Sequence, residues 1–225
     1  MAPDWAGIDL VVFDVDGTLY RQRPLRLRMA RELLIHSVRR RDAKIIAVLA
    51  RYRRLREQLG EAQAVDFEPA LVARTAAATS VSPDKVRAIV AEWIDERPLP
   101  YLAACRYPGL PQLFAGLRRR GKAIGVLSDY SARAKLEALD LAADHVACAA
   151  DAGIGVLKPH PRGLNALIAM AGAAPHRTLV IGDRPDRDGL AAHAAGAKAL
   201  IRSSRPIAGW QTFARYDDPL FAPVL

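Results

Sequence analysis

Two aspartates stand two residues apart, directly after a short apolar run near the start of the chain. Residues 8–13 read Ile-Asp-Leu-Val-Val-Phe, and Asp14, Asp16 and Gly17 follow them. Side chains two apart on an extended chain face the same way, so the two carboxylates converge. They repel each other unless a cation or proton lies between them, and a hard cation such as Mg²⁺ prefers oxygen ligands. One carboxylate could attack phosphorus while the other moves protons; aspartates that only cap a turn are the alternative.

Three later segments contribute polar residues that follow apolar runs or precede a proline. Ser128 ends the run Ala-Ile-Gly-Val-Leu, where its hydroxyl could donate to a phosphate oxygen. Lys158 precedes Pro159, and its charge could neutralise a nucleophile and a transferring phosphoryl group. Asp183 follows Gly182 and is a natural further metal ligand, with Asp188 able to reach the metal from the next helix. Taken singly, Ser128 fits an ordinary turn and Lys158 a solvated surface better than a functional site.

The elements that must position these residues alternate between strands and helices. Short apolar runs rich in β-branched residues predict buried strands, and they occur at 8–13, 123–127, 178–181 and 198–201. Helical stretches are expected around 110–120, 131–139, 162–171 and 188–195. This alternation predicts an α/β fold with a parallel sheet covered on both faces. Ligands of such sheets bind beyond the carboxyl ends of the strands, where the polar residues stand.

Residues 21–106 interrupt the alternation and are predicted to be helical throughout. An apolar stripe at steps of three and four is typical of an amphipathic helix, and it comprises Ile45, Val48, Tyr52, Leu55 and Leu59. The arginines at 51, 53, 54 and 56 are expected on the other sides of that helix. Ser82 and Pro83 predict a helix start, since Ser is a preferred cap and Pro suits the first turn. The C-terminal segment 210–225 is expected to be an irregular strap.

The four pieces, in this order, resemble the haloacid dehalogenase superfamily of aspartate-nucleophile phosphohydrolases. Asp14-x-Asp16-Gly17-Thr18 resembles its first motif, Ser128 its second and Lys158 its third, while Gly182-Asp183 with Asp188 resembles its fourth. The resemblance spans residues 8–201. It implies a doubly wound, Rossmann-like core formed by residues 1–20 and 107–225, with an all-helical cap inserted at 21–106.

The resemblance also implies roles for the site residues. Asp14 would be the nucleophile that forms an aspartyl-phosphate, and Asp16 the general acid and base. Mg²⁺ would be held by Asp14, the backbone carbonyl of Asp16, and Asp183, with Asp188 in its surroundings. The phosphate would be bound by three residues, Thr18, Ser128 and Lys158.

Asp16 bears on the choice of reaction within this family. Members that act as dehalogenases lack the second acid of the first motif, since a halide leaving group needs no proton. Its presence favours a phosphomonoester hydrolase acting on a small or lipid-linked phosphorylated substrate. A phosphomutase stays open as an alternative, because the same residues could pass the phosphoryl group to a second hydroxyl of the substrate.

Positive charge is concentrated in one part of the chain. Residues 21–60 contain thirteen Arg and Lys against three acids, a net charge of +10, so the whole-chain charge of +9 describes this segment alone. Such asymmetry suggests a local anionic partner. Three interpretations compete: arginines that attract an anionic substrate, a basic surface in peripheral contact with acidic lipids, and an ordinary solvated face.

A second class of function is suggested by residues 70–96. Small residues, a tight turn and Val81-Ser82 opening a second helix have the rhythm of a helix-turn-helix that binds DNA. The acidic residues Asp84, Glu92 and Asp95 leave the second helix no more than neutral. Nucleic acid is therefore an unlikely partner, because DNA binding needs a basic surface.

Length and composition limit the remaining classes. A chain of 225 residues with 51% hydrophobic residues is long enough for a substantial core and too apolar for global disorder. It has no run of 18 apolar residues and no signal-peptide pattern. Two distant cysteines, Cys105 and Cys148, fit a reducing compartment. We therefore expect a cytoplasmic location, with peripheral contact at the inner membrane face as an extension.

Overall fold

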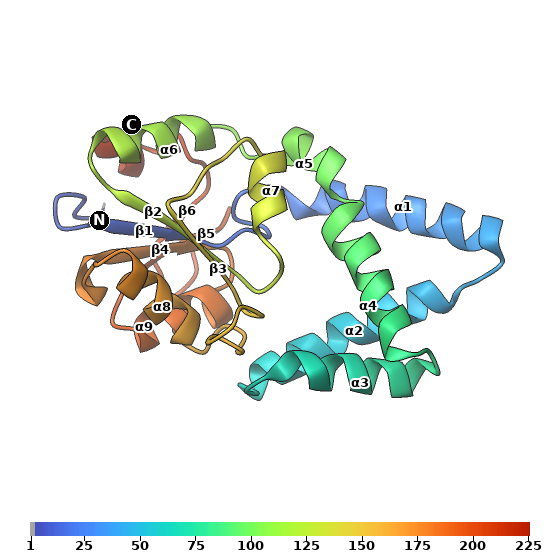
Figure 1. Ribbon diagram of the computed structural model, residues 1–225. Helices are drawn as coiled ribbons and strands as arrows, with labels where there is room; N and C mark the ends of the chain where they lie inside the picture. Colours follow the sequence, from blue (N-terminus) through green and yellow to red (C-terminus); the bar gives the residue numbers. More distant parts are fainter. Residues whose placement is uncertain (1–2) are drawn as a thin grey trace.

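The computed structural model describes residues 3–225 and contains a parallel sheet flanked by helices, with a group of helices set to one side (Figure 1). The sheet has six strands in the order β3-β2-β1-β4-β5-β6. Their bounds are β1 Leu10–Phe13, β2 Ala123–Ser128, β3 His145–Cys148, β4 Thr178–Gly182, β5 Lys198–Arg202 and β6 Thr212–Phe213. Every pairing is parallel. The doubly wound α/β fold expected from the sequence is thus confirmed.

The central strand β1 shows why the sheet is covered on both faces. All four of its residues are buried. Val11 and Phe13 belong to one hydrophobic cluster with helix α6 (Leu110–Arg119), whereas Leu10 and Val12 belong to another with helix α8 (Arg162–Met170). Successive strand side chains point to opposite faces, so a run without polar residues needs two hydrophobic layers.

Two strands were not expected from the sequence. Strand β3 is short and begins with a partly buried histidine, and β6 comprises two residues within the segment predicted to be irregular. These strands lie at the two ends of the sheet order, where one side lacks a strand neighbour and the apolar pattern is weak. A short 3₁₀ helix, Pro219–Val224, lies near the end of the same C-terminal segment, and the residues between it and β6 are turns and irregular structure.

The other core helices lie between the strands. Helix α7 spans Arg133–Ala138 and α9 spans Leu190–Ala194, and a 3₁₀ turn covers Pro175–Arg177. A π-helical turn, η3, covers Pro185–Gly189 just after β4. The helix predicted at 188–195 is therefore shorter than expected, because its first two residues belong to η3 and α9 begins at Leu190.

Residues 21–106, named here the helical segment, are helical as predicted. The segment comprises α1 Gln22–Arg40, α2 Lys44–Glu61, α3 Phe67–Thr79, α4 Pro83–Val90, the π-helical turn η1 Ala91–Glu96 and α5 Leu99–Cys105. The stripe on α2 is buried against α3 and α4 in a hydrophobic cluster. Ser82 caps α4, accepting a hydrogen bond from the Lys85 amide.

One prediction about α2 is wrong. Arg56 was expected on the outer sides of the helix, yet it is buried. It stacks over the ring of Tyr130 at 4.2 Å and donates to the backbone carbonyl of Asp129 in the core. Helical periodicity alone placed this arginine outside, whereas a contact with a distant loop makes its burial favourable.

The helices flanking the predicted turn at 70–96 pack inside the helical segment. Val86 and Ile89 of α4 are buried in the same cluster as Leu71 and Val72 of α3. The exposed side of α4 carries an Asp84–Arg87 ion pair. Mutual packing therefore accounts for the small-residue pattern of this helix pair. Within the described residues, no helix is both long and apolar enough to cross a membrane.

Candidate active site

Asp14 and Asp183 stand at the carboxyl ends of adjacent strands. The amide of Asp14 donates to the Ile181 carbonyl at 2.9 Å, which continues the β1–β4 pairing to the strand tips. Gly17 lies against Asp183 with φ +105°, and a Cβ on residue 17 would stand 2.1 Å from an Asp183 oxygen. Glycine is thus required both for this left-handed backbone and for the close approach of the two segments.

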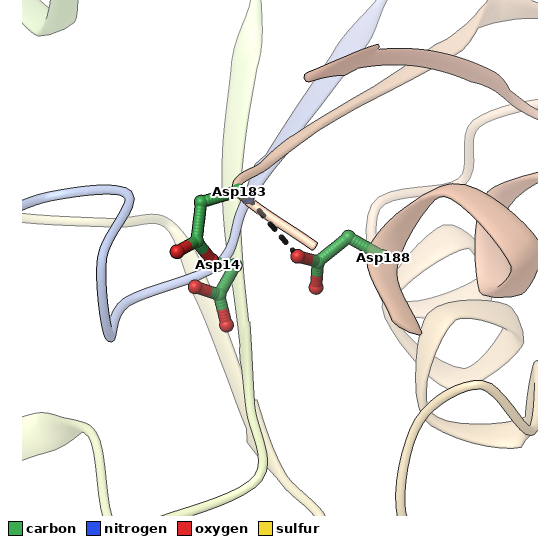
Figure 2. Close-up of side chains that lie close together, drawn as sticks. All are labelled: Asp14, Asp183 and Asp188. Carbon is green, nitrogen blue, oxygen red and sulfur yellow. Dashed lines mark hydrogen bonds between the residues drawn. The ribbon is translucent and has the colours of Figure 1, made fainter. Parts of the chain in front are cut away.

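Asp188 completes a cluster of three carboxylates with Asp14 and Asp183 (Figure 2). It lies in η3, and its carboxylate accepts hydrogen bonds from the amides of Asp183 at 3.2 Å and Arg184 at 3.0 Å. One ligand oxygen from each of the three lies within 4.8 Å of the others. A Cβ on residue 182 would meet the Asp188 side chain at 2.3 Å, so Gly182 leaves room for this turn.

Lys158 bridges two carboxylates of the cluster. Its Nζ lies 2.5 Å from Asp14 Oδ1 and 2.6 Å from Asp188 Oδ1. All three side chains are buried. The amide of Lys158 also donates to Asp129 Oδ1 at 3.0 Å, which fixes the loop that carries the lysine. Buried charges at this spacing interact more strongly than surface pairs, since little water screens them.

Burial and repulsion from neighbouring carboxylates raise the pKa values of Asp14 and Asp183. Burial is the main cause that raises the pKa of Asp14 well above its ordinary value; Lys158 opposes it, and Asp188 and Asp183 add to it. Burial together with Asp188 raises the pKa of Asp183 to about 6. Burial opposes the charge on Lys158, yet Asp14 and Asp188 outweigh it and raise the pKa of the lysine. A further cation would stabilise the ionised carboxylates of this cluster.

The three carboxylates fit a hard divalent cation. Every ligand atom offered is an oxygen, the type that Mg²⁺ binds at about 2.0–2.1 Å, so two of its ligands lie at most about 4.2 Å apart. The observed separations, within 4.8 Å, are close to that limit. The donor set of Asp14, Asp183 and Asp188 is therefore suited to Mg²⁺.

The carboxylate of Asp16 is held by residues that sequence reasoning did not assign to the site. Lys135 Nζ lies 2.8 and 3.0 Å from its two oxygens, and the Tyr20 hydroxyl donates to one of them. Burial opposes the ionised form, but Lys135 and Tyr20 outweigh it and lower the pKa of Asp16. Tyr20 lies two residues after Thr18, the last residue of the first motif. Lys135 carries no distinguishing sequence signal, because a lysine in a predicted helix is usually solvated.

Ser128 and Thr18 are buried near the strand ends. Ser128 Oγ accepts a hydrogen bond from the Tyr130 amide at 3.1 Å and keeps its own proton for another acceptor. Thr18 Oγ1 has no hydrogen-bond partner among the described residues. A buried hydroxyl without a partner is costly, so both hydroxyls have donor capacity for a bound anion. Their roles in phosphate binding stay predictions.

The helical segment touches the loops that follow β2 and β4. Arg187 of η3 is buried and donates to the Lys158 carbonyl at 2.7 Å and to the Glu57 carboxylate of α2 at 2.8 Å. Arg184 binds the same Glu57 at 3.0 Å. Arg184 also donates to the Asp186 carboxylate at 2.8 Å. The helical segment therefore contacts the loop that carries Asp183 and Asp188.

The structure thus brings Asp14, Lys158, Asp183 and Asp188 into direct contact or close range. Among the described residues, the acidic cluster consists of Asp14, Asp183 and Asp188, and the Asp16 carboxylate binds Lys135 instead. The predicted part of Asp16 in metal binding, through its backbone carbonyl, stays a prediction.

Comparison with known families identifies the class of protein. The haloacid dehalogenase-like hydrolase family matches residues 8–196, most of the chain. The protein belongs to this family. The resemblance based on the four motifs is thereby confirmed.

A curated relative shares part of the sequence. A phosphoserine phosphatase of Thermus thermophilus is 30% identical over 125 residues. The match covers 53% of this chain and 47% of the relative, so the chain spans about half the length of the curated relative that it matches.

Solved structures share the fold across several activities. A 2-haloacid dehalogenase from Pseudomonas syringae superposes with a TM-score of 0.64 at 17% identity, covering 93% of this chain and 95% of the other. A HAD phosphatase from Thermococcus onnurineus gives 0.63 at 18%, covering 93% and 94%. A β-phosphoglucomutase from Clostridium difficile gives 0.58 at 20%, covering 88% and 85%. These identities establish the fold alone.

Proposed function

We propose that the protein is a Mg²⁺-dependent phosphomonoester hydrolase that works through an aspartyl-phosphate. The observation that carries this proposal is the bridge of Lys158 between Asp14 and Asp188, with Asp183 beside them. Phosphoryl transfer depends mainly on positioning and on neutralising charge. The site combines a buried carboxylate, a fixed ammonium group and an oxygen-rich cation site within a few ångströms.

Asp14 is the proposed nucleophile. One of its carboxylate oxygens bonds to phosphorus as the bond between phosphorus and the oxygen of the leaving alcohol breaks. Asp16, protonated from solvent beforehand, gives its proton to that oxygen. Lys158 already contacts Asp14 Oδ1 and balances the negative charge of the phosphoryl group.

Water completes the proposed reaction. Asp16, now ionised, takes a proton from a water molecule whose oxygen bonds to phosphorus, and the bond to Asp14 breaks to release inorganic phosphate. Lys135 and Tyr20 hold the Asp16 carboxylate and favour its ionised form, which is the form needed at this step. Ser128 and Thr18 supply hydroxyls for the phosphate oxygens.

Asp14, Asp183 and Asp188 are the residues that would surround Mg²⁺, with the Asp16 carbonyl as a further ligand. The ion would supply positive charge to the phosphate oxygens. The helical segment is the proposed cap that covers the site, since α2 contacts the loops after β2 and β4. The proposed substrate is a small or lipid-linked phosphomonoester, and the proposed location is the cytoplasm, consistent with the free cysteines Cys105 and Cys148.

The first experiment measures release of inorganic phosphate from a generic aryl phosphate with and without Mg²⁺. Wild type is expected to be active only with the metal. Asp14→Asn should abolish turnover while thermal unfolding stays cooperative. Asp217→Asn is a matched control, because Asp217 is exposed and pairs only locally with Arg215. Full turnover by Asp14→Asn would remove Asp14 as the nucleophile.

A second experiment distinguishes hydrolysis from transfer to another hydroxyl. Turnover in ¹⁸O-labelled water should place one labelled oxygen in each inorganic phosphate released. A mutase would instead return the phosphoryl group to the substrate without net phosphate release. A panel of phosphorylated metabolites, including phosphoserine and prenyl-linked sugar phosphates, then identifies the preferred leaving group by kcat/KM.

A further inference from the structure

Helix α1 has one side that packs against the protein and an opposite side that does not. Leu25 and Ser37 are buried on the inner side, and Met29 packs there between two hydrophobic clusters. Glu32 also lies on this side, where its carboxylate accepts a hydrogen bond from the Tyr101 hydroxyl at 2.6 Å. The helix lies at the edge of the helical segment and extends away from the sheet (Figure 1).

The opposite side carries large apolar side chains that face solvent. Leu27, Leu34 and Val38 are 66%, 60% and 68% exposed. Their spacing of seven and four residues aligns them on one stripe of the helix, about 16 Å long at the helical rise. Ile35 adds a fourth exposed apolar residue beside the stripe. Such a patch on one helix exceeds the single exposed residues that soluble surfaces usually show.

Arginines surround this stripe. Residues 21–41 contain eight arginines and one acid, and the acid is Glu32 on the inner side. Arg31 lies within the stripe, four residues after Leu27 and three before Leu34, and it is exposed. Arg23 and Arg26 are exposed near its start, whereas Arg28 stacks over the Tyr101 ring on the inner side. The outer side of α1 is therefore both apolar and strongly cationic.

We propose that the outer side of α1 binds the surface of a bilayer containing anionic lipids. A helix lying in the interface places apolar side chains at the boundary of the acyl chains and arginines at the lipid phosphates. Each basic residue near an anionic surface adds attraction. A second copy of this chain is a poorer occupant, since two such faces would set arginines against arginines. This proposal goes beyond the proposed function and requires no catalytic activity.

The test measures co-sedimentation of the full chain with vesicles. Vesicles of phosphatidylcholine alone are compared with vesicles that also contain phosphatidylglycerol. Binding is expected with the mixed vesicles, at least about tenfold weaker without the anionic lipid, and weakened by salt. Equal binding to both kinds of vesicle, or none to either, would overturn the proposal.

Two triple variants separate the apolar and cationic contributions. Leu27→Ser, Leu34→Ser and Val38→Ser together should reduce binding to mixed vesicles by about tenfold or more. Met170→Ser with Leu190→Ser is the matched control, because these two residues lie outside the helical segment and are also exposed, at 57% and 47%. Replacement of Arg23, Arg31 and Arg39 by glutamine should reduce binding and its salt dependence. The control with the same charge change replaces Arg120, Lys198 and Arg205 by glutamine.

Two further measurements guard against indirect effects. Circular dichroism melts should be unchanged, since every replaced side chain is exposed. Size-exclusion chromatography with light scattering of the wild type and the serine variant tests self-association. A dimer that the serine variant dissociates, without vesicle binding by the wild type, would assign the face to a second copy and overturn the lipid proposal. Unchanged vesicle binding by the serine variant would also overturn it.

Discussion

Charged residues behave in opposite ways at the strand ends and on α1. At the strand ends, Lys158, Asp14 and Asp188 are buried and bind one another at 2.5 and 2.6 Å. On the outer side of α1, the arginines are exposed to solvent and lie beside exposed leucines. Charged side chains thus depend on direct contacts with one another at the strand ends, whereas on α1 they are separately solvated.

The two regions differ because their charged side chains have different access to water. Burial removes hydration, so each charge at the strand ends depends on its partners, and losing one leaves another uncompensated. On α1, water screens each arginine separately, and single changes have small effects on folding. Single substitutions should therefore be informative at the strand ends, whereas only grouped substitutions are informative on α1.

The largest effect is expected for Lys158→Met. The change leaves the Asp14 and Asp188 carboxylates buried without their cation, which costs about 3–5 kcal/mol of unfolding free energy. Turnover of an aryl phosphate should fall by about 10²–10³-fold or more. Urea unfolding and kcat/KM measure the two effects. The control is Lys122→Met, because Lys122 binds only the backbone carbonyl of Ile8 and lies away from the cluster; an equal loss of turnover in that control would contradict the comparison.

Gly17→Ala is expected to act on activity more than on stability. The new Cβ would lie 2.1 Å from an Asp183 oxygen, so Asp183 must move, and a displacement of about 1 Å at such a site costs about 100-fold in kcat/KM. Gly153→Ala is the matched control, since Gly153 also has positive φ, +83°, with nothing within 4 Å. Both variants should lose about 1–2 kcal/mol of stability from the left-handed backbone. Similar kcat/KM values for both would show that the close approach to Asp183 is unimportant.

The Arg187–Glu57 pair joins the strand-end loop to helix α2, and it tests the effect of burial within a single ion pair. The Arg187 side chain is 6% exposed and that of Glu57 is 53% exposed. Arg187→Met should cost about 2–3 kcal/mol, because the Lys158 carbonyl loses a buried charged donor. Glu57→Gln should cost less than about 1 kcal/mol, as exposed ion pairs do. Urea unfolding measures the loss of unfolding free energy in both variants. Equal losses would mean that the ion pair with Glu57, and not the buried hydrogen bond to the Lys158 carbonyl, fixes the loop after β4.

The free energy of unfolding of the metal-free protein is also expected to depend on pH. Burial and Asp188 raise the pKa of Asp183 from 3.8 to about 6. The folded state then binds the proton more tightly than the unfolded state, so this group stabilises the fold below about pH 4, and that contribution is lost as pH rises through about 6. The loss should be about 3 kcal/mol. Unfolding curves with EDTA at several pH values measure it; Asp183→Asn should remove this part of the slope, and Mg²⁺ should reduce it.

Much of the site could be predicted from sequence because it depends on local order along the strands. An apolar run followed by Asp14 and Asp16 predicts a strand with carboxylates at its end, and parallel strands bring such ends together. Asp183 follows the same reasoning, whereas Lys158 follows no strand and was predicted from its resemblance to the third family motif. By contrast, Lys135 and Arg56 gave no signal, because their burial depends on contacts with Asp16 and with the Asp129 carbonyl, residues 119 and 73 positions away.

The sequence by itself determined the alternation of strands and helices, the helical segment and its positive charge, because these depend on periodicity and composition. Only the tertiary structure decided which charges are buried and which side of α1 faces outward. Burial of a charge is favourable or costly according to partners distant in the chain, and Lys158 at 2.5 Å from Asp14, 144 residues earlier, is the clearest case. Local sequence holds no information about such partners, whereas folding brings them together.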